Sequence, residues 1–120
     1  MALPGMRSSA PELARHTLRV ADYTRTPGGR YPDDGPFPGS EFRDAWLAPA
    51  FRKAQADGAI LLVDLDGTAG YASSFLEEAF GGLARSFGVE QVLAGIELKS
   101  KAEPYLIDDI RLQYVPEANE

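Results

Sequence analysis

The chain contains no cysteine and a single histidine among its 120 residues. Without cysteine it can form neither disulfide bonds nor thiolate zinc sites, and this composition favours a cytoplasmic location. One histidine supplies too few nitrogen ligands for a transition-metal centre. We therefore expect no cofactor and no metal site.

The sequence also lacks long apolar runs and an excess of positive charge. No apolar run approaches the roughly 18 residues of a membrane-spanning helix, and residues 1–13 show no apolar signal core. With 12 Lys and Arg against 18 Asp and Glu, the net charge is −6, so no broad basic face is available for nucleic acid. We expect neither a membrane nor a nucleic-acid partner.

Length and composition predict one small globular domain. Hydrophobic residues make up 44% and charged residues 25%, which is ordinary for a chain with a single core. We predict a flexible N-terminal tail over residues 1–15, a folded domain over residues 16–115, and a flexible C-terminal tail over residues 116–120 that begins at Pro116.

Apolar residues recur with strand and helix periods in alternation. Alternating or continuous apolar patterns predict strands at residues 16–23, 59–65 and 91–98. Spacing of three and four residues predicts helices at residues 40–57, 73–87 and 104–114. This order predicts an α/β fold with one domain, in which a small mixed sheet is packed by about three helices.

Individual residues within these helices carry further expectations. Ser40 is predicted to cap the first helix, and Pro49 to kink it or to begin a second helix. Gly81 and Gly82 lie inside a predicted helix, where each costs about 1 kcal/mol relative to alanine, so they predict close packing against another backbone. Arg43 is expected to form an ion pair with a nearby carboxylate, either Glu41 or Asp66, and the alternative is that it recognises an anionic ligand.

A stretch rich in proline and glycine separates the first predicted strand from the first helix. Residues 24–39 hold four of the nine prolines and four of the twelve glycines. Pro27 to Gly29 are typical of a turn, with a short return strand at Arg30 and Tyr31. One functional hypothesis is an oligomerisation domain that uses this stretch.

The sequence DLDGT at residues 64–68 follows an apolar strand and resembles the first motif of haloacid-dehalogenase-type phosphatases. The resemblance implies Asp64 as nucleophile, Asp66 as acid or base, and Mg²⁺ bound to both carboxylates. Candidates for the rest of such a site are Ser100, Lys99 or Lys101, and Asp108-Asp109. The last pair falls within the predicted helix at 104–114, and few strands follow the motif, so this small phosphohydrolase is the alternative hypothesis.

Three longer motifs resemble a different family. They are GSEFR at 39–43, LLVDLDG at 61–67 and SSFLEEAFGGL at 73–83. Together they resemble a bacterial STAS-like family of unknown function over roughly residues 16–115, related to the STAS domains of anti-sigma-factor antagonists. The resemblance implies a non-enzymatic regulatory domain without catalytic residues. Its implied partner is a protein, a histidine-kinase-like ATPase, and a homodimer is a further possibility.

In the antagonists a buried strand leads through a loop to a pair of serines that opens a helix. Ser73 and Ser74 occupy that place and are the phosphoacceptor candidates that the resemblance implies. Ala72 and Phe75 stand where the antagonists have an acidic residue and a glycine. Physically, a serine at a helix start also predicts an N-cap. The partner-binding candidates are Asp66, Gly67, Tyr71, Phe75, Glu77 and Glu78.

Overall fold

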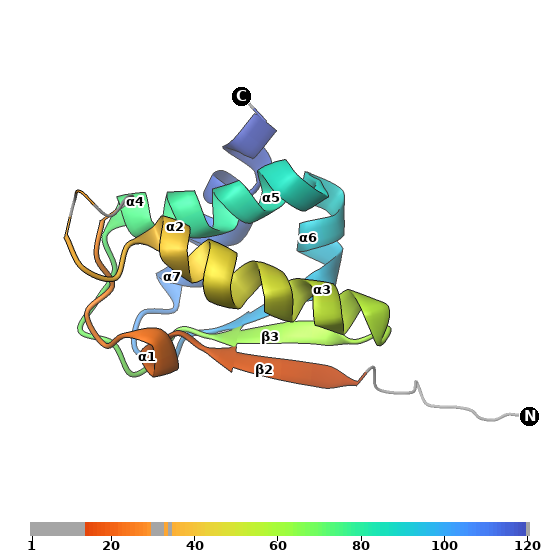
Figure 1. The fold of residues 1–120 in the computed structure, drawn as a ribbon, viewed down its shortest axis with the longest axis horizontal. Helices are drawn as coiled ribbons and strands as arrows, with labels where there is room; N and C mark the ends of the chain where they lie inside the picture. Colours follow the sequence, from red (N-terminus) through yellow and green to blue (C-terminus); the bar gives the residue numbers. More distant parts are fainter. Residues whose placement is uncertain (1–13, 30–32, 34, 120) are drawn as a thin grey trace, which may run out of the picture.

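The computed structural model describes residues 14–29, 33 and 35–119, and the statements that follow concern those residues. Figure 1 shows a sheet at the base of the molecule with the long helices stacked above one of its faces. The predicted N-terminal tail over residues 1–15 falls largely outside the described residues, as does the predicted return strand at Arg30 and Tyr31. No helix in the described ranges is long and apolar enough to cross a membrane.

Three strands form the described sheet, in the order β2-β3-β4. They are β2 (Arg15–Arg19), β3 (Ile60–Asp64) and β4 (Ile96–Lys99). Both pairings are parallel, so the α/β domain is as predicted but this sheet is parallel instead of mixed. Helices between successive strands supply the crossover that parallel pairing requires.

The central strand separates the core from an outer face. Leu61 and Val63 are fully buried beneath the helices, whereas Ile60, Leu62 and Asp64 are partly exposed on the opposite face. A continuous apolar run is typical of a strand that is covered on both faces, but the described helices lie on one face (Figure 1). The apolar run reflects a central position in the sheet rather than burial of both faces.

The first long helix is continuous from Gly39 but changes pitch. It consists of α2 (Gly39–Phe42), a π-helical segment η2 (Arg43–Leu47) and α3 (Ala48–Ala56). The widened turn comes directly before Pro49, whose missing N–H and ring disturb regular helix pairing. The N-cap is Pro38, so the prediction of Ser40 as the cap was wrong.

The second long helix confirms the prediction for residues 73–87. It consists of α4 (Ser73–Leu76), a π-helical segment η3 (Glu77–Gly81) and α5 (Gly82–Phe87). A Cβ atom on Gly81 would lie 3.2 Å from the main-chain oxygen of Tyr114, which is the predicted approach to a backbone. A Cβ atom on Gly82 would instead meet the side chain of Arg43.

The predicted strand at 91–98 was wrong over its first half. Residues there form helix α6 (Val89–Gly95), and β4 begins only at Ile96. Similarly, the predicted strand at 16–23 ends at Arg19, and α1 (Val20–Tyr23) follows. In both segments the short apolar pattern fits the period of a strand as well as that of a helix, so packing against the rest of the fold decides which one forms.

The last predicted helix is confirmed as α7 (Tyr105–Asp109) followed by a π-helical segment η4 (Ile110–Tyr114). The chain then forms a short 3₁₀ helix, η5 (Pro116–Asn119). Ala118 of this segment is only 2% exposed, so this one side chain packs on the core, whereas the sequence predicted a flexible tail for 116–120.

Candidate functional site

The loops after the three parallel strands meet at one edge of the sheet. The amide of Ala69, in the loop after β3, donates to the carbonyl oxygen of Arg25 at 2.8 Å. In the same loop, a Cβ atom on Gly67 would lie 3.1 Å from the Cβ of Ala21 in α1. The carboxyl edge of a parallel sheet is where open α/β sheets bind their ligands, so this edge is the candidate site.

Asp64 ends β3 and lies between two cations. Its Oδ1 accepts a hydrogen bond from the amide of Asp66 at 3.0 Å. Its Oδ2 lies 4.0 Å from Nε of Arg19 and 3.7 Å from Nζ of Lys99, which are its neighbours in register on β2 and β4. At these distances the two contacts are ion pairs and not hydrogen bonds.

Asp66 joins the loop after β3 to the loop after β4. Its carboxylate accepts hydrogen bonds from the amides of Lys101, at 2.9 Å to each oxygen, and of Ala102, at 3.0 Å. The amides of Ala102 and Lys101 hold the pKa of the Asp66 carboxyl below its ordinary value, with smaller help from the charges of Lys99 and Lys101. Both oxygens are thus committed to fixing one loop against the other.

Tyr71 anchors the end of the same loop. Its hydroxyl donates to the carbonyl oxygen of Leu65 at 2.7 Å, and its ring packs 6.0 Å from that of Phe75. Burial raises the pKa of Tyr71 to about 12. Phe75 is 0% exposed, so its side chain belongs to the core and is not a surface contact for a partner. Gly67 is exposed and has φ +92°, a backbone conformation that favours glycine.

The two serines lie at the start of α4 but do not cap it. The N-cap is Ala72, and no side chain caps the helix, so the N-cap prediction was wrong for both serines. Ser73 is exposed and Ser74 is half-buried. Burial raises the pKa of Tyr114, and a side-chain hydrogen bond with Ser73 opposes this rise. Ser73 therefore contacts the end of η4.

The two glutamates predicted to bind a partner have different surroundings. Glu78 is only 6% exposed, because its carboxylate pairs with the guanidinium of Arg43 in the helix opposite. Arg43 also donates to the carbonyl oxygen of Glu78 at 3.2 Å and to Asp44 at 2.9 Å. Glu77 is more exposed and pairs with Arg85 at 3.1 Å. Arg43 was expected to pair with Glu41 or Asp66, but Glu78 and Asp44 are its partners, and Glu78 is a structural residue.

The residues proposed for a phosphohydrolase come together only in part. Lys99 and Lys101 do lie beside the two aspartates. Asp108-Asp109 lies on α7, as predicted, and Ser100 is engaged with Glu103, whose carbonyl oxygen accepts its hydroxyl at 2.8 Å. Among the described residues, no group of three or more His, Cys, Asp or Glu side chains is arranged to hold a metal ion.

Comparison with known families gives one match. A family model described as a STAS-like domain of unknown function (DUF4325) matches residues 39–106, from the first residue of α2 to the second residue of α7. Comparison with curated proteins and with solved structures gave no match. The matched region covers more than half of the chain and contains both long helices, the central strand and the loops after β3 and β4, whereas β2 and the segment that follows it lie outside the match. The chain therefore belongs to this STAS-like family.

Proposed function

We propose that the domain is a non-enzymatic regulatory module that binds a partner protein. The docking surface consists of the loop at residues 66–72 and the exposed start of α4. The observation that carries this proposal is that the loop is both accessible and fixed. Asp66 ties it to the loop after β4, and Tyr71 ties it to Leu65. A surface that is already ordered loses little conformational entropy on binding.

The partner that we propose is a histidine-kinase-like ATPase, and phosphorylation of Ser73 would control its binding, with Ser74 as the second candidate acceptor. The family resemblance supplies the partner class. Exposure of Ser73 at the first position of a helix that runs to Phe87 supports its accessibility to a kinase. A phosphate adds a charge of about −1.5 to −2, and the amides at a helix start accommodate such an anion.

Ser73 variants test the switch directly. We expect Ser73→Asp to keep the thermal midpoint near that of the wild type and to weaken partner binding, because the new charge lies on the docking surface. Ser73→Ala should bind normally and lose at most about 1 kcal/mol of stability through the contact with Tyr114. The matched control is Ser86→Asp, which changes an exposed serine near the end of the same helix.

The measurement is co-purification from the native host, followed by identification of the captured ATPase and titration with the purified variants. Phosphopeptide mapping after incubation of the two proteins with ATP locates the acceptor. Equal binding by Ser73→Asp, Ser86→Asp and wild type, or a phosphate on neither Ser73 nor Ser74, would reduce Ser73 to a structural residue and remove the switch from the proposal.

A phosphohydrolase built on Asp64 and Asp66 has less support, because amide donors occupy both oxygens of Asp66. We expect Asp64→Asn to leave phosphomonoester hydrolysis in the presence of Mg²⁺ at the background rate of the wild type. Hydrolysis well above buffer that disappears in this variant would favour the enzyme. The oligomerisation hypothesis for residues 24–39 stays a prediction, since residues 30–32 and 34 lie outside the described structure.

A further inference from the structure

Four cations gather at the carboxyl edge of the sheet, in a chain whose net charge is −6. We name this set the cationic corner, and its members are Arg19, Arg25, Lys99 and Lys101. Arg19 and Lys99 are neighbours in register across the end of the sheet, with Asp64 between them. Lys101 follows in the loop that Asp66 holds, and the carbonyl of Arg25 accepts the amide of Ala69 in the adjacent loop.

The carboxylates at this edge leave the cations without a full set of ion-pair and hydrogen-bond partners. Asp64 is shared by Arg19 and Lys99 at 4.0 and 3.7 Å, beyond hydrogen-bond distance. Both carboxylate oxygens of Asp66 accept hydrogen bonds from main-chain amides. Within the described part of the chain, neither Arg25 nor Lys101 has a carboxylate within ion-pair distance, as the remaining pairs lie elsewhere.

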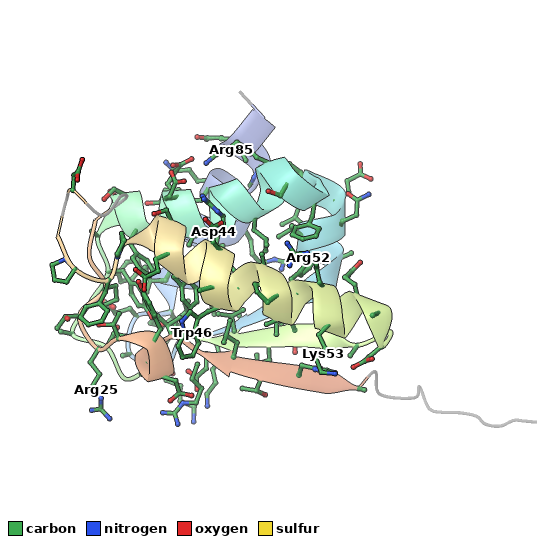
Figure 2. All side chains as sticks on the ribbon, in the orientation of Figure 1. Arg25, Asp44, Trp46, Arg52, Lys53 and Arg85 are labelled. Carbon is green, nitrogen blue, oxygen red and sulfur yellow. The ribbon has the colours of Figure 1, made fainter. Side chains whose placement is uncertain are left out.

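The charged ends of the cationic corner are accessible to solvent. The side chains of Arg19 and Lys99 are 53% and 43% exposed, and Arg25 and Lys101 are exposed. Figure 2 shows Arg25 extending away from the fold beside α1. By contrast, the Asp64 side chain is 14% exposed. The Asp64 carboxylate is thus largely buried, and positive charge faces outward beside the loop at 66–72.

We propose that the cationic corner binds an acidic segment of the partner protein. This inference rests on the proposed docking role of the loop at 66–72 and specifies the chemistry of what docks there. Carboxylates of the partner would take the donors that Asp64 and Asp66 leave available. The same complementarity explains why a phosphate on Ser73 would oppose binding, because it adds charge of the same sign as the partner. The acidic character of the whole chain disfavours DNA or an anionic membrane, whose charge extends beyond the corner.

The test uses a fluorescent peptide of alternating Glu and Gly, with a Lys and Gly peptide of equal length as its counterpart. We expect the wild-type chain to bind the acidic peptide, measured by fluorescence anisotropy, and to release it as salt is raised. Lys99→Gln/Lys101→Gln should weaken this binding about tenfold, because two exposed charge contacts are lost. Both substitutions keep the main-chain amide of residue 101, so the hydrogen bonds to Asp66 persist.

The matched control is Arg52→Gln/Lys53→Gln, which removes two exposed cations from α3, away from the corner (Figure 2). It should bind the acidic peptide as the wild type does. A second variant, Asp64→Asn, should bind the peptide severalfold more tightly, since it removes the competing charge and keeps Oδ1 as acceptor for the amide of Asp66.

Several outcomes would overturn the inference. One is an equal loss of affinity for the acidic peptide in the two double variants. Another is that the wild type does not bind this peptide and Asp64→Asn does not increase the affinity. A third is preferential binding of a DNA duplex or of phosphatidylserine vesicles that depends on Lys99 and Lys101. Capture of the partner ATPase by Lys99→Gln/Lys101→Gln at wild-type affinity would also overturn it, while the docking proposal itself would survive. If the Ser73 variants had no effect while the peptide result held, the phosphorylation switch would be removed from the proposed function and the inference about the cationic corner would survive.

Discussion

Two charged clusters in this domain use the same kinds of side chain in opposite ways. Between the two long helices, the buried Arg43–Glu78 pair has side chains that are 19% and 8% exposed and in direct contact. At the cationic corner, Arg19 and Lys99 are 53% and 43% exposed and stand farther from Asp64. Burial penalises a charge that lacks hydrogen bonds, so the first cluster is tightly paired, whereas exposure to solvent permits the cations of the second to remain loosely paired.

The same contrast between a buried and an exposed charge is found within one sequence motif. Glu77 and Glu78 are adjacent and acidic, yet the helix turns Glu78 toward Arg43 and leaves Glu77 more exposed. The partner candidates therefore divide into core residues, Phe75 and Glu78, and residues at the surface. A docking proposal for this family is best built on the second group.

The largest effect is expected from breaking the buried pair. Glu78→Ala leaves the guanidinium of Arg43 without its main carboxylate, and we expect a loss of about 3 kcal/mol in the free energy of unfolding. Urea denaturation followed by circular dichroism measures it. The control Asp44→Ala removes the other carboxylate partner of Arg43, which is 70% exposed, and should cost less than about 0.5 kcal/mol. Equal losses in the two variants would mean that burial does not distinguish these pairs.

A smaller loss should follow from crowding the same pair. In Gly82→Ala the new Cβ would lie 2.7 Å from Cδ of Arg43, and overpacking of this kind costs about 1 to 3 kcal/mol. In an Arg43→Ala background the same change should be neutral or favourable, because the obstacle is gone and alanine is the better helix former. A double-mutant cycle by chemical denaturation checks this coupling. Additive effects would show that Arg43 moves aside freely.

At the site edge, Asp66→Asn should lower the thermal midpoint by an amount that depends on pH. The folded-state pKa of Asp66 lies below its ordinary value of 3.8, so its stabilising contribution is complete above that pH and is lost as the pH falls through the folded pKa. The difference from wild type should therefore be constant between pH 5 and 7 and shrink below about pH 4. Thermal scans across this range measure it, and a difference that grows on acidification would contradict the assignment.

The smallest stability effect is expected at the cationic corner itself. Lys99→Gln/Lys101→Gln should change the free energy of unfolding by less than about 0.5 kcal/mol, because exposed ion pairs contribute little. Denaturation under the conditions used for Glu78→Ala provides the comparison. A loss approaching that of the buried pair would show that these lysines hold the fold, and that their effect on binding is indirect.

Much of the fold was accessible from local patterns. The helix over residues 73–87 was predicted from leucines and phenylalanines at spacings of three and four, and the central strand from its continuous apolar run. The helix at 89–95 was missed because Val92, Ala94 and Ile96 also alternate with period two, and a segment of this length carries too few residues to separate the two periods. Only its packing on neighbouring helices shows which period applies.

The candidate site was predicted in position but not in composition. A strand, a glycine-containing loop and a serine pair suffice to locate the loop at 66–72, since each is a local feature of the sequence. The sequence did not reveal Arg19 as a neighbour of Asp64, and it indicated Lys99 and Lys101 only through the phosphatase resemblance. These contacts depend on the register of β2 and β4 against β3 and on hydrogen bonds between residues 35 positions apart in the chain.

By itself, the sequence determined the local elements and the family motifs, because periodicity, glycine and proline act on the backbone within a few residues. Tertiary structure alone decided which charges are buried and which face solvent. Glu78 is a structural residue because Arg43 lies opposite it across two helices, and Lys99 remains exposed and only loosely paired because its carboxylate is shared with Arg19. Burial and pairing depend on groups distant in sequence, so the same residue types become a core contact in one place and an exposed cluster in the other.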